Sequence, residues 1–353
     1  MEKAAIVYHR GVEGYDFGPG HPFRGDRFPR FMRLLEEYGL LSKPGVELVE
    51  PGPAGDTDLL LVHSEDYIRQ VELLGSLHAQ ISVDTPLSPS IVEAARLIVG
   101  TSLRAGELVA EGSVGIAEGV GGGLHHAGRG YGGGFCVFND VAVCAQSLLD
   151  RHGLERVLIF DTDVHAGNGT MDVFYEEPRV LYASVHQDPR TLYPGTGFIE
   201  QVGSGPGEGY TVNIPLPPDA DDGCMRLVLD EVFKPLAGEF RPQAIIRNGG
   251  SDPHFMDRLG GLGLTFEGLR SIGEAVVEAA RTSKCGIVDL CCSGYNPSIV
   301  AEGWLAILSG LLGLEKYPKE NVHPPKASEE IYRATRRTID DLKSLMREYW
   351  NLD

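Results

Sequence analysis

The chain has 353 residues, of which 42% are hydrophobic and 23% charged, and its formal net charge at pH 7 is −19. This composition is that of an ordinary globular protein, and the negative charge argues against a surface that binds nucleic acid. No apolar run approaches the ~20 residues of a membrane-spanning helix. The six cysteines show no C-x-x-C pairing and follow no secretory leader. We therefore expect a cytoplasmic protein with reduced thiols.

Apolar patterns predict strands and helices that alternate along the chain. In chain order, we expect a strand at 4–7, helices at 30–38, 64–74 and 90–108, a strand at 114–117, a helix at 139–150, strands at 157–160, 180–185 and 244–246, a helix at 268–282, a strand at 287–290, and helices at 304–312 and 328–350. No linker or repeat interrupts the series. It predicts one α/β domain over residues 1–353, with a mostly parallel central sheet flanked by helices and a C-terminal helical extension at about 328–350.

Three of the predicted strands lead directly into polar residues. The strand at 157–160 runs into Asp161, Asp163 and His165, the strand at 244–246 is followed by Asp252, and the strand at 287–290 is followed by Tyr295. Ligands in open α/β sheets collect just beyond the carboxyl ends of the strands. We therefore expect an active site at this edge of the sheet.

The spacing Asp161-x-Asp163-x-His165 places three side chains on the same side of an extended segment. With Asp252 from another strand, Asp163 and His165 would give three protein ligands and one open position, as in a catalytic zinc site. Such a site also accepts Fe(II). Asp161 would then be free to orient a histidine. The alternative is that these aspartates only cap the following helices.

His125 and His126 stand together after a Gly-rich run, and a further glycine-rich segment extends from Gly128 to Gly134. Two adjacent histidines beside spare Asp and Asn residues suggest contacts that fix which ring nitrogen carries the proton. The alternative for a histidine in such a loop is an ordinary surface or core position.

These motifs resemble those of the zinc-dependent deacetylase family, which includes histone deacetylases, acetoin utilization proteins and acetylpolyamine amidohydrolases. The resemblance spans roughly the first 310 residues in the family's order. It rests on 122–126, 134–140 and 161–170, and extends to Gly20-His21-Pro22 with Arg27, to 193–197, to Ser251-Asp252 with Asp257 and Leu259-Gly260, and to Gly294-Tyr295.

The resemblance implies a role for each matched position. Asp163, His165 and Asp252 would bind zinc. His126 would act as general base and then acid, with His125 as its electrostatic partner, while Asp161 would pair with His125 and Asn168 with His126. Tyr295 would hydrogen-bond the substrate carbonyl. The substrate-binding residues would be Gly134, Phe135 and Tyr193 along an acyl-lysine tunnel and Asp84 at its rim. A structural potassium ion would lie near Asp161, Asp163, His165, Ser184 and Val185.

The activity implied is hydrolysis of the amide of an acetylated amine, either an acetyl-lysine protein or a small acetylpolyamine. The strong negative charge is compatible with a cationic substrate. Two alternatives are an arginase-like ureohydrolase with two manganese ions and a catalytically silent binding protein. The acyl group, the native metal and a homo-oligomeric state are left open.

Some positions depart from the family pattern. Arg247 makes the strand before Asp252 more polar than expected, and it would either point out of the sheet or reach a carboxylate. His254 follows Asp252 closely, but Pro253 restricts the chain between them. We therefore expect His254 to support the site or to lie at the surface rather than to bind metal. Cys291-Cys292-Ser293 replaces a glycine-richer run before Tyr295, which leaves the mobility of that loop open.

Overall fold

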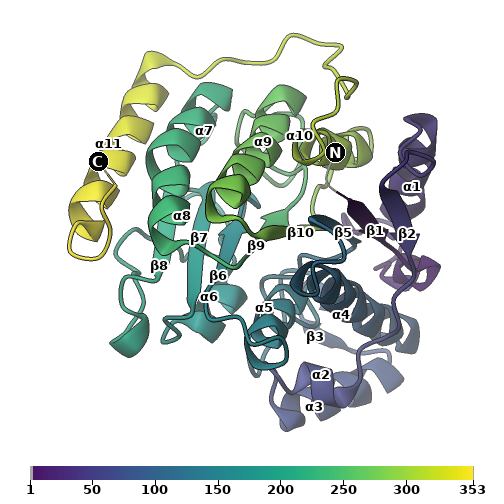
Figure 1. Cartoon of the computed structure of the whole chain (residues 1–353). Helices are drawn as coiled ribbons and strands as arrows, with labels where there is room; N and C mark the ends of the chain where they lie inside the picture. Colours follow the sequence, from purple (N-terminus) through teal and green to yellow (C-terminus); the bar gives the residue numbers. More distant parts are fainter. Residues whose placement is uncertain (1–2, 353) are drawn as a thin grey trace. The chain divides into compact units, whose positions relative to one another are not determined.

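The computed structural model describes residues 3–352 as an α/β fold (Figure 1). The strands are β1 (Ala4–Val7), β2 (Val46–Val49), β3 (Gln80–Ser82), β4 (Thr85–Pro86), β5 (Ile116–Val120), β6 (Val157–Asp161), β7 (Val180–Gln187), β8 (Thr211–Leu216), β9 (Ala244–Gly249) and β10 (Gly286–Cys291). The helices are α1 (Arg27–Glu37), α2 (Asp56–Leu59), α3 (Glu65–Ser76), α4 (Pro89–Ala110), α5 (Asp140–Asp150), α6 (Asn168–Phe174), α7 (Asp222–Val228), α8 (Lys234–Phe240), α9 (Phe266–Ser283), α10 (Val300–Leu311) and α11 (Glu329–Met346). The strand order is β2-β1-β5-β10-β9-β6-β7-β8 in an eight-stranded sheet, and β3 and β4 form a separate pair.

The chain divides into two compact units. The first unit runs through Leu154 and also contains Asn168–Val173 and Val288–Cys292; the second comprises Glu155–Gly167, Phe174–Ile287 and Ser293–Asp353. The expectation of a single domain with a C-terminal extension stays a prediction.

In the first unit, β1 pairs in parallel with β2 on one side and with β5 on the other. All four residues of β1 are buried, which explains why its sequence is a continuous apolar run instead of an alternating one. Helix α4 packs against β1, β5 and α5. The side chain of Ser88 caps α4 by accepting a hydrogen bond from the backbone N–H of Ile91, and Pro89 occupies the first turn, where no N–H is needed.

In the second unit, β6 lies between β9 and β7 in parallel register, and β8 pairs in parallel with β7. Every residue of β6, β7 and β9 is buried. Helix α9 begins after Thr265, whose side chain caps the first turn, and packs along α10. Nearly all of α10 is buried, so its sequence is apolar on all sides.

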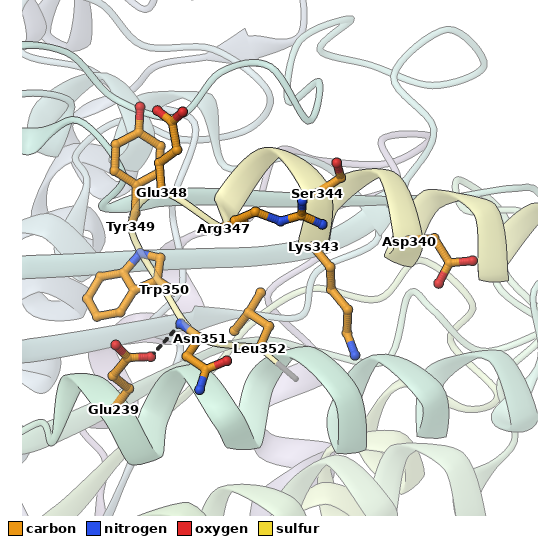
Figure 2. Close-up of a pocket in the computed structure, with 10 residues that line it drawn as sticks. All are labelled: Glu239, Asp340, Lys343, Ser344, Arg347, Glu348, Tyr349, Trp350, Asn351 and Leu352. Atoms are coloured by element: carbon orange, nitrogen blue, oxygen red, sulfur yellow. Dashed lines mark hydrogen bonds between the residues drawn. The ribbon is translucent and has the colours of Figure 1, made fainter.

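The C-terminal segment packs against the second unit through α11. Ser328 caps α11, and the helix packs against α7 and β8 (Figure 1). Most of its charged residues are exposed. Beyond α11, the indole N–H of Trp350 donates to the carbonyl of Gly209 at 2.6 Å. A hollow of about 610 Å³ lies here, lined by Glu239 of α8 and by nine residues between Asp340 and Leu352. Figure 2 labels these lining residues. None of the predicted site residues lines the hollow.

The predicted strands and helices are confirmed, with ends that shift by a few residues. The sequence patterns did not predict β2, β3, β4, β8, α2, α6, α7 or α8. Two residues of β2 are exposed, and β8 contains Pro215, so neither strand carries a clear apolar pattern. No helix in the described part of the chain is long and apolar enough to cross a membrane.

Candidate active site

The ends of β6 and β9 bring the predicted metal ligands together. Asp161, the last residue of β6, is the register partner of Asn248 in β9. Because the two strands are parallel, the residues that follow them emerge at the same edge. Gly249 has a φ of +131°, and a Cβ there would lie 2.8 Å from the backbone nitrogen of Asp163. A glycine is thus required where β9 passes the Asp163 segment.

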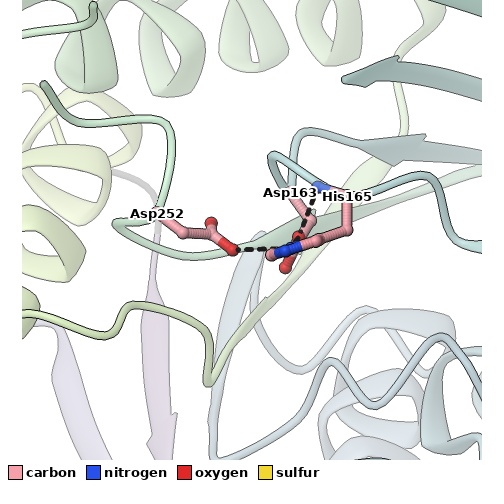
Figure 3. Close-up of side chains that lie close together, drawn as sticks. All are labelled: Asp163, His165 and Asp252. Carbon is pink, nitrogen blue, oxygen red and sulfur yellow. Dashed lines mark hydrogen bonds and ion pairs between the residues drawn. The ribbon is translucent and has the colours of Figure 1, made fainter. Parts of the chain in front are cut away.

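Asp163, His165 and Asp252 form a buried cluster whose ligand atoms all lie within 4.8 Å of one another. The Nδ1 atom of His165 lies 2.9 Å from Oδ1 of Asp163 and 3.5 Å from Oδ2 of Asp252. Figure 3 shows the imidazole between the two carboxylates, with Asp163 and His165 on one segment and Asp252 on another. The predicted cluster is therefore present.

The electrostatics of this cluster favour a cation. Burial lowers the pKa of His165, but the contacts and charges of Asp163 and Asp252 outweigh burial and raise it to about 10. Burial and the charge of Asp163 raise the pKa of Asp252 to about 8. Oδ2 of Asp252 is fully buried and accepts no hydrogen bond from the described residues. Two carboxylates and one imidazole that converge in this way are a suitable donor set for a divalent metal.

Asp161 supports the segment that carries the ligands. Its Oδ1 accepts hydrogen bonds from the backbone N–H of Asp163 at 3.2 Å and from the side-chain amide of Asn248 at 3.0 Å, and its Oδ2 accepts from the hydroxyl of Tyr182 at 3.1 Å. Ser184 is the register partner of Asp161 in β7, and its hydroxyl lies 2.8 Å from Nδ1 of His186. This places Ser184 and Val185 on the strand beside Asp161, as the potassium prediction requires, without testing that prediction.

Hydrogen bonds hold the loop after β10 against the Asp252 segment. The hydroxyl of Ser293 donates to Oδ1 of Asp252 at 2.9 Å, and the carbonyl of Ser293 accepts from the indole of Trp304 at 2.7 Å. The backbone N–H of Tyr295 donates to Asp257 at 2.7 Å. The segment next to Tyr295 is therefore held at several points.

Two tyrosines flank His165. The ring of Tyr295 lies edge-on to the His165 ring with centroids 6.2 Å apart, and the Tyr193 ring lies 6.4 Å away in a similar arrangement. Tyr295 is 8% exposed and Tyr193 is 47% exposed. Tyr193 can therefore meet a ligand from solvent, while Tyr295 presents a phenol from within the protein.

The adjacent histidines belong to the first unit, where they follow β5. His125 and His126 are buried, and their Nε2 atoms lie 3.1 Å apart. Nδ1 of His126 lies 2.8 Å from the amide oxygen of Asn168. An amide oxygen only accepts, so a neutral His126 carries its proton on Nδ1 and leaves Nε2 as an acceptor. The Asn168–His126 contact expected from the sequence is present.

A buried network holds the loop of the two histidines. The Asn139 side chain caps α5 and also donates to the carbonyl of Ala127 at 2.9 Å and to the hydroxyl of Thr170 at 3.0 Å. Asp140 accepts from the backbone N–H groups of Gly123 and Leu124. Burial raises the pKa of Asp140 to about 6, although these hydrogen bonds oppose the shift.

His63 completes this network, and the sequence analysis missed it. Its Nε2 accepts from the backbone N–H of Asn139 at 2.9 Å, and its Nδ1 lies 2.9 Å from the carbonyl of Gly128. Burial lowers the pKa of His63 to about 4. A single histidine at the end of an apolar run gives no signal of this role, since its partners lie more than 60 residues away.

The predicted substrate residues of the first unit lie on two hydrogen-bonded loops. Phe135 follows Gly134 and has a φ of +67°; its N–H donates to the hydroxyl of Thr85, and its carbonyl accepts from the phenol of Tyr15 at 2.6 Å. Asp84, in the turn between β3 and β4, is half-buried and accepts from the hydroxyl of Thr85 at 2.9 Å. A non-glycine residue held in this region of φ is a feature of functional loops.

Burial bears on the expectations for His254 and Arg247. His254 is 1% exposed, so the alternative that it lies at the surface is wrong. Its Nδ1 accepts from the backbone N–H of Met256, its Nε2 lies 3.4 Å from Glu320, and its ring stacks on Phe255. Arg247 is completely buried within β9, and both alternatives for its side chain stay predictions.

Comparison with known proteins agrees with this arrangement. Residues 21–311 match the model of the histone deacetylase domain. A probable deacetylase from Archaeoglobus fulgidus is 35% identical over 98% of both chains. The acetoin utilization protein AcuC of Bacillus subtilis is 36% identical over 75% of this chain and 70% of its own length.

A plant relative and a solved structure extend the comparison. The chloroplastic histone deacetylase 10 of Oryza sativa is 34% identical over 92% of this chain and 77% of its own length. The crystal structure of the HDA15 HD domain superposes with a TM-score of 0.87 at 28% identity and covers 99% of this chain and 95% of that one. With the buried Asp–His–Asp cluster in place, these matches show that the chain belongs to the histone deacetylase domain family.

Proposed function

We propose that this protein is a metal-dependent deacetylase that hydrolyses the amide of an acetylated amine. The observation that carries the proposal is the buried cluster of Asp163, His165 and Asp252, which supplies three ligands from two neighbouring strand ends. A zinc ion bound there would polarise the acetamide carbonyl and lower the pKa of water beside it. Fe(II) would suit the same oxygen-rich donor set.

In this proposal His126 transfers protons and His125 assists it. His126 takes a proton at Nε2 from the attacking water and later delivers it to the leaving amine, and His125 supports it electrostatically with Asp161 as its partner. Asn168 keeps the other proton of His126 on Nδ1. The sequence supports a common role for Asn168 and the metal ligands, because Asn168 follows His165 by only three residues in the chain.

The remaining site residues would recognise the substrate. The phenol of Tyr295 donates to the carbonyl oxygen as its negative charge grows, a contact worth about 2.7–4 kcal/mol of barrier in comparable sites. Gly134, Phe135 and Tyr193 would contact the acyl chain and its linker, and Asp84 would accept from the amide N–H groups of the substrate. Asp161, Asp163, His165, Ser184 and Val185 would hold a structural potassium ion.

We further propose that the substrate is a cationic acetylated amine. Both an acetyl-lysine side chain and an acetylpolyamine present an acetamide on a cationic, flexible chain. The formal charge of −19 favours either cation over a neutral or acidic substrate.

The test is a side-by-side assay of zinc-loaded and iron-loaded protein on N-acetylspermidine and on acetyl-lysine peptides. Tyr295→Phe is the active-site control, and Tyr332→Phe on the exposed side of α11 is its matched control. A higher kcat/KM for the polyamine indicates a metabolic deacetylase, and a higher value for the peptide indicates protein deacetylation.

Activity on neither substrate, with the metal bound, would contradict the proposal. Metal content is measured on the same samples. One divalent ion per chain agrees with a deacetylase centre, whereas two manganese ions together with urea release would support the ureohydrolase alternative.

A further inference from the structure

A chain of hydrogen bonds extends from His126 to the surface of the first unit. The amide nitrogen of Asn168 donates to the hydroxyl of Tyr131 at 3.3 Å, and that hydroxyl donates to Oδ2 of Asp172 at 2.6 Å. Tyr131 is 40% exposed, and Asp172 is exposed on α6. Tyr131 lies within the glycine-rich segment, where an isolated bridge joins it to Gly128. Neither Tyr131 nor Asp172 has a role in the mechanism given above.

The directions of these bonds follow from the chemistry of each group. A carboxylate only accepts, so Asp172 takes the single proton of the Tyr131 hydroxyl. The hydroxyl oxygen is then left as an acceptor, and it faces the NH2 group of Asn168. The amide of Asn168 must therefore turn its oxygen toward His126.

We propose that Tyr131 and Asp172 are positioning residues that lock the Asn168 amide and, through it, the Nδ1–H tautomer of His126. An asparagine amide can rotate by 180° and exchange its donor and acceptor ends. Turned the other way, Asn168 would present N–H to His126, and the neutral ring would have to carry its proton on Nε2. A ring protonated there cannot accept a proton from water.

The tautomer of His126 also determines its contact with His125. The two Nε2 atoms are 3.1 Å apart, so one proton fits between them. With Nδ1–H on His126, Nε2 of His126 keeps its lone pair and can take a proton. With the amide reversed, His126 becomes the donor and its basic site is lost.

This inference rests on the proposed role of His126, so its first test does not depend on turnover. The tautomer of His126 is read from ¹H–¹⁵N NMR of the imidazole nitrogens in the full-length, zinc-loaded protein, with His126→Gln for assignment. Wild-type protein should show the proton on Nδ1. Tyr131→Phe, which removes the acceptor for the Asn168 amide, should show a mixture of both tautomers.

Asp172→Ala is the second variant, because it frees the Tyr131 hydroxyl either to accept from the amide nitrogen of Asn168 or to donate to its amide oxygen. It should give a smaller shift in the same direction. Tyr349→Phe is the matched control, since Tyr349 makes a similar exposed bond to Glu208 at 2.7 Å. It should leave the His126 signals unchanged.

Kinetics provide a readout that separates positioning from folding. Tyr131→Phe should lower kcat by ~tenfold and change KM by less than twofold, because water at this exposed site replaces part of the lost contact and keeps the effect below that of losing the base itself. An unchanged His126 tautomer and kcat in Tyr131→Phe would overturn the inference. Absence of turnover in wild-type protein would contradict only the proposed function, and the NMR result would still decide the role of Tyr131.

Discussion

The amide oxygen of Asn168 lies 2.8 Å from Nδ1 of His126, and no carboxylate takes that place. A neutral partner orients the ring without adding a negative charge that would favour its protonated form. In the proposed mechanism, this keeps the histidine available as a base near neutral pH. This relationship can be tested by replacing Asn168 with an aspartate, which places a negative charge beside His126.

Asn168→Asp should raise the acidic limb of the kcat/KM profile by about one pH unit, because a carboxylate at this distance stabilises the imidazolium and raises the pKa of His126. The measurement is kcat/KM between pH 5 and 9. Asn321→Asp, in an exposed loop, adds the same charge outside the network and should leave the limb in place. An unshifted limb in Asn168→Asp would show that another group controls it.

Metal binding should stabilise the protein through Asp252. The free energy of unfolding should rise by about 2.7 kcal/mol at zinc concentrations 100-fold above Kd, because the ion binds the folded state. Asp252→Asn should lose most of this rise, since one of three ligands is weakened. Thermal melting with zinc and with chelator measures it. Asp188→Asn, which removes a carboxylate paired with Arg190, is the control and should keep the zinc-induced rise.

The buried His63 should make stability depend on pH. Its pKa is about 4 in the folded protein and about 6.5 unfolded. Between these values only the unfolded chain binds the proton, so the stability from His63 is present above pH 6.5 and is lost as pH falls toward 4. The full shift corresponds to roughly 3 kcal/mol.

The measurement for His63 is urea unfolding of wild type and His63→Gln at pH 7 and pH 4.5. The advantage of the wild type should shrink at the lower pH. Asp140 titrates in the opposite sense, because its raised pKa makes folding less favourable as pH rises through 6. It is present in both proteins, so the difference between them isolates His63. An equal difference at both pH values would contradict the assignment.

Gly294→Ala should impair turnover more than metal binding. Gly294 has a φ of +125°, and an added Cβ would lie 2.1 Å from the hydroxyl of Ser251. The strain, about 1–3 kcal/mol, would displace the adjacent Tyr295. Gly238→Ala is the control, because a Cβ there meets no atom within 4 Å. Metal content and kcat of both variants are compared; a normal kcat in Gly294→Ala would show that the loop absorbs the change.

The metal ligands could be predicted because the sequence pattern shows where the strands end. The apolar runs of β6 and β9 are each followed within a few residues by Asp or His, and parallel pairing brings those ends to one edge. Asn168 was predicted from family resemblance and from the spare amide near two histidines. Secondary structure with long apolar periodicity, such as α4 and α9, was also predicted well.

The residues that hold the site were harder to predict. His63 and Tyr131 act through contacts with backbone carbonyls and with single side chains distant in sequence, and such contacts leave no periodic pattern. His254 could not be placed because its burial depends on the segment between α10 and α11, which brings Glu320 beside it. Short or irregular strands such as β8 could not be predicted for a related reason. Neighbouring strands determine their pairing more than their own composition does.

The packing of α11 has a practical consequence. The family match ends at residue 311, yet α11 lies beyond it and packs against β8, the last strand of the sheet. An uncovered edge strand offers its backbone to another chain and promotes aggregation. A fragment cut at the family boundary would uncover this edge, so preparations of the catalytic region alone should self-associate unless the residues through Trp350 are retained.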